Sequence, residues 1–228
     1  MARACFKSRG MTSHDRKRIA GVVLAGGLSR RMGGGDKGLA PLGGHTMLGE
    51  VIRRVGPQVG HLVLNANGDP ERFRDFGLEV VADTVEGFVG PLAGVLAGLR
   101  WAAANVPDAK HVLSVSSDAP FLPDDLASRL ATAAADAAAV TPAGIAMARS
   151  AGELHPVIGL WPVHLADDLE AALRSGVRKV LAWTDRHGTL PVDFAMLRLG
   201  GETVDPFFNA NTPPELDEAR RLLALMRP

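Results

Sequence analysis

The stretch from Leu24 to Lys37 holds the residues of this chain best suited to binding a ligand. It contains five glycines and three basic residues and follows an apolar run, Ile19–Ala25. Glycine has no Cβ, so such a backbone can approach a ligand closely and turn several N–H groups toward it. Clustered N–H donors beside cations suit a polyphosphate. The residues are Gly26, Gly27, Gly33, Gly34, Gly35, Arg30, Arg31 and Lys37.

This loop differs from two common nucleotide-binding motifs. Lys37 is followed by Gly38, whereas the lysine of a Walker A motif is followed by Ser or Thr. Gly26 and Gly27 are adjacent and the next glycine is Gly33, so GxGxxG is absent. That absence disfavours a dinucleotide-dependent dehydrogenase. The simpler alternative is a flexible loop whose charges are incidental.

Asp118 is a candidate metal ligand, because it follows another apolar run, His111–Val115, after Ser116 and Ser117. Mg²⁺ prefers oxygen ligands and often binds through one or two carboxylates together with substrate phosphates. The alternative is a turn aspartate that caps the next helix. Asp124 and Asp125 lie nearer to that helix and suit the positive end of its dipole equally well.

Asn65 and Asp83 are candidates for recognising a nucleobase or a ribose, and each follows an apolar run. Guanine presents donors at N1 and N2, so a carboxylate or amide oxygen can select it against adenine. Taken alone, each residue is explained more simply by local structure: a turn for Asn65 near Gly68, and a cap for Asp83 before Thr84.

Gly90, Gly94 and Gly98 recur at four-residue spacing in a predicted helix that opens with Pro91. A glycine within a helix lowers the stability of the helix by about 1 kcal/mol relative to alanine, so the three glycines require an explanation. Close packing against the sheet and a ligand at the helix N-terminus both remain open for Gly94.

Four residues are weaker candidates for contact with a second, anionic substrate. His155 precedes a predicted strand and is equally well explained as a structural histidine. Arg178 and Lys179 form a basic pair that also suits a solvated helix face. Asn211 lies just before Thr212, where a capped helix start is sufficient explanation.

Short apolar runs alternate with helical patterns along the chain, which predicts an α/β fold. Because ligands bind at the carboxyl ends of strands in an open parallel sheet, we expect the polar residues after these runs to share one edge. The predicted strands are Ile19–Ala25, His61–Leu64, Leu78–Val81, His111–Val115, Val157–Trp161 and Leu190–Phe194, with further strands or a hairpin at Ala137–Val140 and Ile145–Ala148. The predicted helices are His45–Val59, Gly90–Ala104, Pro123–Ala135, Val163–Arg174, Arg178–Asp185 and Pro213–Met226.

Composition narrows the classes of function. The 228 residues are 46% hydrophobic and 22% charged, as expected of a globular domain. Zero formal net charge and only 5% aromatic residues disfavour a nucleic-acid partner. No run of about 18 apolar residues predicts a membrane span. Cys5 is the single cysteine, which fits a reducing, cytoplasmic compartment.

The first 18 residues are polar and basic and lack the apolar segment of a signal peptide. They are predicted to be a disordered leader or the product of a start placed too early, with Met11 as the alternative start. A transit peptide is a weaker alternative. A single domain is predicted over residues 19–228.

The sequence contains neither Gly-x-Ser-x-Gly nor His-Glu-x-x-His. Nucleotidyl transfer needs no protein nucleophile, because a substrate phosphate can attack the α-phosphate of a nucleotide directly. The protein aligns the two anions and stabilises charge on the leaving pyrophosphate. Backbone amides, Arg31, Lys37 and Mg²⁺ on Asp118 would supply those functions.

These residues together resemble those of a known family. Leu24–Gly27 with Ser29–Gly33 and Lys37 resembles the signature of nucleotidyltransferases that act on sugar phosphates or cofactor phosphates. The closer similarity is to the molybdenum cofactor guanylyltransferases of the MobA-like family. Further matches extend along the chain: Asn65–Asn67, Asp83, Gly90–Gly94, Asp118–Leu122, His155–Pro156 and Asn209–Pro213.

The resemblance implies a single-domain, three-layer Rossmann-like fold with a mostly parallel sheet, as in nucleotide-diphospho-sugar transferases. It implies Mg²⁺-dependent transfer of GMP from GTP to the terminal phosphate of the molybdenum–molybdopterin cofactor, with cofactor-delivery and acceptor proteins as partners. The implied residues for GTP are Leu24, Ala25, Gly26, Gly27, Lys37, Asn65, Asp83, Gly94 and Asp118; for catalysis, Lys37, Arg31 and Asp118; for Mg²⁺, Asp118; and for the pterin side, His155, Arg178, Lys179 and Asn211.

Three alternatives remain beside this reading: a cytidylyltransferase for the same cofactor, a sugar-phosphate nucleotidyltransferase, and a non-catalytic nucleotide or cofactor carrier. The matches at Asn65–Asn67 and Gly90–Gly94 favour the guanine enzyme. The presence of Lys37 and Asp118 disfavours a carrier.

Overall fold

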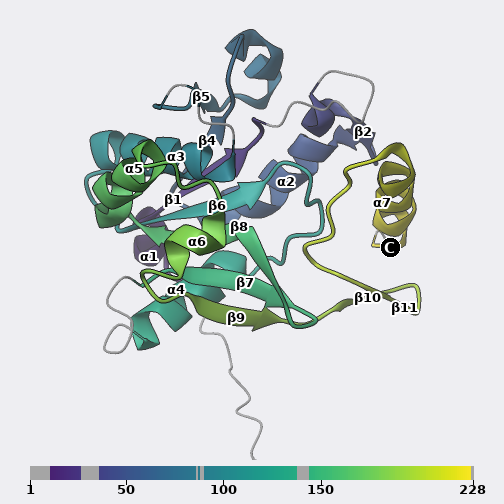
Figure 1. Cartoon of the computed structure of the whole chain (residues 1–228). Coiled ribbons are helices and arrows are strands. Elements are labelled where there is room, and N and C mark those ends of the chain that lie inside the picture. The colour runs from purple at the N-terminus through teal and green to yellow at the C-terminus, as the bar shows by residue number, and fades with distance from the viewer. Residues whose placement is uncertain (1–10, 27–35, 86, 88–89, 138–143, 227–228) are drawn as a thin grey trace, which may run out of the picture.

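Seven strands form the central sheet of the computed structural model, in the order β5-β4-β1-β6-β8-β7-β9 (Figure 1). The structure describes residues 11–26, 36–85, 87, 90–137 and 144–226. Within these residues β8 alone runs antiparallel to its neighbours in the sheet. The strands are β1 (Ile19–Leu24), β4 (His61–Asn65), β5 (Glu79–Val81), β6 (His111–Ser116), β7 (Ala146–Ser150), β8 (Glu153–Pro162) and β9 (Leu190–Phe194). The predicted α/β fold with a mostly parallel sheet is confirmed.

Helices cover both faces of the sheet. Because side chains alternate along a strand, Val23 of β1 packs into the apolar cluster on one face and Val22 into the cluster on the other. The first face is covered by α2 (Met47–Val55) and α4 (Leu126–Asp136), and the second by α3 (Pro91–Asn105), α5 (Ala166–Arg174) and α6 (Val180–Thr184). The result is the three-layer arrangement that the resemblance implies.

A third apolar cluster lies beside the sheet and holds the last helix, α7 (Pro213–Leu225). Figure 1 shows α7, in yellow, beyond β2 and α2. Leu216 and Leu222 of α7 share this cluster with Leu42, Met47 and Phe121. This packing places α7 against the segment that follows the glycine loop. Two short strand pairs belong to the same region: β2 (Pro41–Leu42) with β3 (His45–Thr46), and β10 (Leu197–Leu199) with β11 (Glu202–Val204).

Some predicted elements differ from the observed ones. The helix expected from Pro123 begins at Leu126. A strand at Ala137 is wrong, because Ala137 caps the end of α4; residues 138–143 lie outside the described part of the chain. The two short strand pairs and the turns η2 (Lys37–Leu39) and η4 (Pro70–Phe76) were not predicted. The helix expected at His45–Val59 is observed as the strand β3, the helix α2 and the turn η3 (Gly56–Gln58). The helix expected from Val163 begins with the turn η5 (Val163–Leu165).

Part of the expected leader is ordered. Helix α1 (Ser13–Lys17) opens with a capping box in which Thr12 and Asp15 exchange hydrogen bonds. Arg16 donates to the Pro57 carbonyl at 3.1 Å, which ties this helix to the body of the protein. Within the predicted leader, Ser13–Lys17 are therefore helical, and residues 1–10 lie outside the description. Among the described residues, no helix has both the length and the apolar character needed to cross a membrane.

Candidate active site

Three residues that lie far apart in the sequence meet at the Lys37 ammonium. Lys37 opens the turn η2, and its Nζ donates to Asp118 Oδ2 and, at 2.5 Å, to Asn211 Oδ1. The other carboxylate oxygen of Asp118, Oδ1, accepts from Ser116 Oγ. Asp118 is only 7% exposed, so its charge is buried and paired with a cation, as a buried carboxylate requires. We call these three residues the Lys37–Asp118–Asn211 centre.

Backbone hydrogen bonds place Asp118 beside the end of β1. Ser117 N donates to the Leu24 carbonyl at 3.1 Å, one residue before the aspartate. The Asp118 carbonyl accepts from Ala210 N at 3.0 Å, which joins this turn to the segment that leads into α7. The end of β6, the end of β1 and the start of α7 are thus fixed to one another.

Asn211 is held by the cap of α7. Thr212 and Glu215 form a capping box, and Asn211 N also donates to Glu215 Oε2 at 2.7 Å. That backbone hydrogen bond, with contributions from Thr212 and the Lys37 charge, lowers the pKa of the Glu215 carboxyl. The predicted capped helix start is therefore real, and it also presents Asn211 to Lys37.

A second polar cluster lies at the ends of β4 and β5, around Asp83. Asn65 Nδ2 donates to Asp83 Oδ1 at 3.0 Å, and Asn67 Nδ2 donates to Asp83 Oδ2 at 2.8 Å. Asp83 N donates back to Asn67 Oδ1 at 2.9 Å. Two amides therefore fix the orientation of one carboxylate. A carboxylate offers about four acceptor positions, so it retains capacity for further donors.

Gly94 allows α3 to approach this cluster. A Cβ at Gly94 would lie 2.2 Å from Asn65 Oδ1 and 2.8 Å from a methyl carbon of Leu24. Ala25 N donates to the Asn65 carbonyl at 2.9 Å, and a Cβ at Gly26 would lie 3.8 Å from Asn65 Oδ1. The start of the glycine loop therefore borders Asn65, and close packing accounts for Gly94.

Arg72 connects the two clusters. Its Nε lies 2.7 Å from Asp36 Oδ2, in the residue before Lys37. Its Nη2 donates to the Asn67 carbonyl at 2.6 Å. Sequence reasoning missed Arg72, which lies in an exposed turn without any motif. It also gave no role to Ser116, and it used Asn67 only as part of the family match at Asn65–Asn67.

His155 lies on β8 among groups that satisfy it. Its Nε2 is 2.7 Å from Ser150 Oγ, and that hydroxyl donates to Asp205 at 2.8 Å. The ring lies 4.6 Å from that of Phe207. Burial lowers the pKa of His155, opposed by the negative charges of Asp205 and Glu153. These contacts support the structural interpretation of His155.

The other candidates for the pterin side are exposed. Arg178 Nη1 donates to the Leu173 carbonyl at 3.2 Å, at the end of α5, and its own carbonyl lies 3.9 Å from a Cβ position built on Gly90. Lys179 is the N-cap residue of α6. Arg178 therefore borders the start of α3. Gly27 and Arg31 fall outside the described residues, and their roles stay predictions.

Comparison with known proteins finds similarity over most of the chain. The sequence model of the MobA-like NTP transferase domain matches residues 21–189. The molybdenum cofactor guanylyltransferase of Mesorhizobium japonicum is 52% identical over 212 residues, which cover 92% of this chain and 99% of that protein.

Two solved structures share the fold. Molybdopterin-guanine dinucleotide biosynthesis protein A of Archaeoglobus fulgidus matches with a TM-score of 0.67 and 22% identity, over 90% of this chain and 98% of that one. A Mycobacterium tuberculosis protein solved in complex with manganese matches with a TM-score of 0.58 and 22% identity, over 90% and 98% of the two chains.

Proposed function

This chain belongs to the MobA-like NTP transferase family, and we propose that it is a molybdenum cofactor guanylyltransferase. In this proposal it transfers GMP from GTP to the terminal phosphate of the molybdenum–molybdopterin cofactor, forming molybdopterin guanine dinucleotide and pyrophosphate. Identity of 52% to a relative with that name supports it. The observation that carries it is the meeting of Lys37, Asp118 and Asn211 where β1 and β6 end.

The reaction needs alignment and charge stabilisation. An oxygen of the cofactor phosphate attacks the α-phosphorus of GTP, the bond from that phosphorus to the bridging oxygen breaks, and pyrophosphate leaves. Lys37 would donate to the triphosphate and stabilise the charge that moves onto pyrophosphate. The glycine loop, with Gly27 and Arg31, would also bind the phosphates, so that the two anions stay in line.

The residues present fit a magnesium ion at Asp118. Its carboxylate is nearly buried and already pairs with a cation, so the position stabilises positive charge. Within the described residues, no group of three or more His, Cys, Asp or Glu side chains could hold a metal. Mg²⁺ often binds through one carboxylate together with water and substrate phosphates, and Asp118 would supply the carboxylate. When bound, the ion would neutralise phosphate charge and polarise the α-phosphoryl group.

Asp83 is the residue that favours guanine. Held by Asn65 and Asn67, its carboxylate can accept hydrogen bonds from the N1 and N2 positions of guanine. Cytosine offers a single exocyclic amino donor, so it would satisfy this carboxylate less well. We therefore propose GTP as the nucleotide, with a cytidylyltransferase or sugar-phosphate enzyme of the same fold as the alternative.

Nucleotide choice is testable by thermal shift in the presence of Mg²⁺. We expect GTP to raise the Tm of the protein more than CTP does at equal concentration. Stabilisation by CTP and none by GTP would overturn the choice of nucleotide and would leave the family assignment intact.

For the second substrate we propose contacts with Asn211, His155, Arg178 and Lys179, the residues that the resemblance implies for the pterin side. Arg178 borders the start of α3, and Asn211 contacts Lys37, which we propose binds the triphosphate. Proteins that deliver and collect the cofactor in the cytoplasm are the partners that this function requires.

A further inference from the structure

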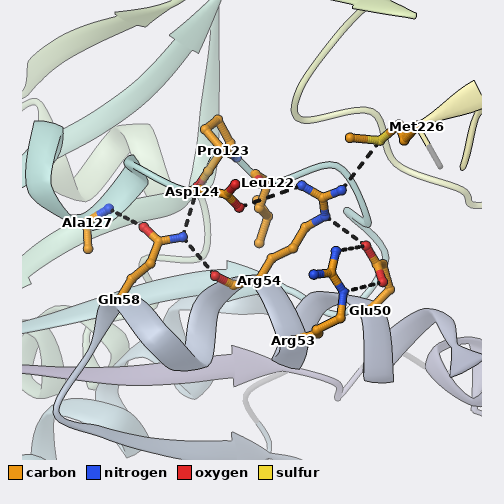
Figure 2. Close-up of polar contacts among 9 residues, drawn as sticks. All are labelled: Glu50, Arg53, Arg54, Gln58, Leu122, Pro123, Asp124, Ala127 and Met226. Atoms are coloured by element: carbon orange, nitrogen blue, oxygen red, sulfur yellow. Dashed lines mark hydrogen bonds and ion pairs between the residues drawn. The ribbon is translucent and has the colours of Figure 1, made fainter. Parts of the chain in front are cut away.

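Helix α2 and the turn η3 that follows it carry a buried polar side that the proposed reaction does not use directly (Figure 2). Glu50 is 1% exposed, Arg54 8% and Gln58 7%. Arg54 Nε donates to Glu50 Oε1 at 2.9 Å, so the two charges neutralise each other within the helix. Charged residues are rarely buried without such a partner. With its charge balanced, the Arg54 guanidinium has donors left for other segments.

Those donors reach two segments outside α2, as Figure 2 shows. Arg54 Nη1 donates to the Leu122 carbonyl at 3.2 Å, four residues after Asp118. It also lies 3.8 Å from Asp124 Oδ1. Arg54 Nη2 donates to Met226 Sδ at 3.4 Å, directly after α7. One side chain therefore holds the turn after Asp118 and the end of the last helix.

Gln58 holds the continuation of the same turn. Its Nε2 donates to the Pro123 carbonyl at 2.9 Å, and its Oε1 accepts from Ala127 N at 3.0 Å. Asp125, the N-cap residue of α4, makes no side-chain cap of its own. The backbone between Asp118 and α4 is thus fixed by Arg54 of α2 and Gln58 of η3.

The segments that meet at Arg54 are the ones that carry the Lys37–Asp118–Asn211 centre. Lys37 leads through η2 and β2–β3 into α2, Asp118 leads into Leu122, and Asn211 leads into α7. They meet once at Lys37 Nζ and a second time at the Arg54 guanidinium. We propose that Arg54 is a positioning residue that fixes Asp118 and Asn211 relative to Lys37 for nucleotidyl transfer.

This inference rests on the proposed function, because the geometry of the centre matters only if it holds a triphosphate and its metal ion. Displacement of reacting groups by about 1 Å costs an enzyme up to about 100-fold in rate. Loss of Arg54 would let the turn after Asp118 move without removing any group that touches a substrate. The expected defect is therefore in turnover and metal binding, with GTP affinity largely kept.

Two matched substitutions test the proposal: Arg54→Lys and Arg53→Lys. Each keeps a positive charge beside Glu50. Arg53 donates to both oxygens of Glu50, at 2.9 and 2.7 Å, and reaches neither Leu122 nor Met226. A lysine at position 54 can pair with Glu50 but cannot span Leu122 and Met226 at once. Circular dichroism and Tm establish that both variants are folded at the assay temperature.

We expect Arg54→Lys to lower kcat about 10-fold, with the KM for GTP changed less than about 3-fold. The Mn²⁺ concentration that half-saturates the GTP complex, measured by electron paramagnetic resonance, should rise for this variant. Arg53→Lys should match the unsubstituted protein in all three quantities.

If Arg54→Lys matches Arg53→Lys in kcat and in Mn²⁺ binding, or raises only the KM for GTP, the positioning role is wrong. If the unsubstituted protein releases no pyrophosphate from GTP and molybdopterin cofactor, the proposed function fails, and the Mn²⁺ titration still decides the role of Arg54.

Discussion

At the residue scale, the proposal depends first on the charge of Asp118. Asn at this position keeps the size of the side chain. Its amide oxygen can accept from Lys37, and its amide nitrogen can donate to the Ser116 hydroxyl, so we expect Asp118→Asn to fold normally. Without the carboxylate charge the proposed Mg²⁺ site is lost, and kcat should fall by about 100-fold or more. Pyrophosphate release and circular dichroism measure the two effects. Asp125→Asn is the matched control. Near-normal turnover of Asp118→Asn would remove the metal role.

A second prediction at this scale concerns the proposed contact between Lys37 and the phosphates of GTP. A hydrogen bond from a charged donor contributes about 1.5–3 kcal/mol, so Lys37→Ala should weaken GTP binding roughly 10- to 100-fold. Isothermal titration in the presence of Mg²⁺ gives the affinity directly. Lys17→Ala, on exposed α1, removes the same charge elsewhere and should leave the affinity unchanged. Equal affinities for both variants would argue against contact between Lys37 and phosphate.

Which residues meet was only partly predictable from the sequence. Lys37, Asn65, Asp83 and Asp118 follow apolar runs, and the parallel sheet brings the ends of such runs to one edge. The contact between Lys37 and Asn211 spans 174 residues and depends on how α7 packs, which no local pattern encodes. The roles of these residues stay predictions until the variants are measured.

At the element scale, α3 must lie close enough to the sheet to touch Asn65. Because a Cβ at Gly94 would lie 2.2 Å from Asn65 Oδ1, Gly94→Ala should displace that side chain. We expect the free energy of unfolding to fall by about 1–3 kcal/mol, and GTP binding to weaken with it. Denaturant unfolding and GTP titration measure both effects.

Gly56→Ala is the matched control for this prediction. Gly56 has helical backbone angles, and a Cβ there would meet nothing within 4 Å. Alanine at this position should therefore leave stability unchanged or raise it by up to about 1 kcal/mol. A Gly94→Ala protein as stable as Gly56→Ala would show that α3 can move away from Asn65 without cost.

The ends of helices and the shortest strands were the parts of the fold that the sequence could not predict. The helix α4 begins at Leu126 and not at Pro123. The N–H of Ala127 in its first turn donates to Gln58, 69 residues earlier, a contact that no local pattern predicts. Strands of two or three residues, such as β2 and β10, are too short to show a period of two. Long apolar runs such as β1 are predictable because burial on both faces requires them.

At the scale of the whole molecule, His111 links stability to pH. Burial, together with the positive charges of His164 and Arg18, lowers the pKa of His111 from 6.5 to about 4. Below pH 6.5 the unfolded chain therefore binds more protons than the folded one, and stability falls as the pH falls from about 6.5 toward 4. Between pH 7 and pH 5 this residue should cost about 2 kcal/mol.

His111→Gln removes that contribution. Urea unfolding of this variant should show a smaller loss of stability between pH 7 and pH 5 than the unsubstituted protein shows, by about 2 kcal/mol. Identical losses in the two proteins would mean that His111 gains its proton as readily in the folded state as in the unfolded one.

The central claim is that this protein moves GMP onto the molybdopterin phosphate. The most direct measurement incubates the protein with Mg²⁺, molybdenum–molybdopterin cofactor and GTP labelled at either the α- or the γ-phosphorus. We predict that the α-label appears in a pterin dinucleotide and the γ-label in pyrophosphate, in equal amounts, and that Asp118→Asn abolishes both. Release of γ-label as free phosphate, or no transfer of α-label from GTP when CTP is an active donor, would contradict the account.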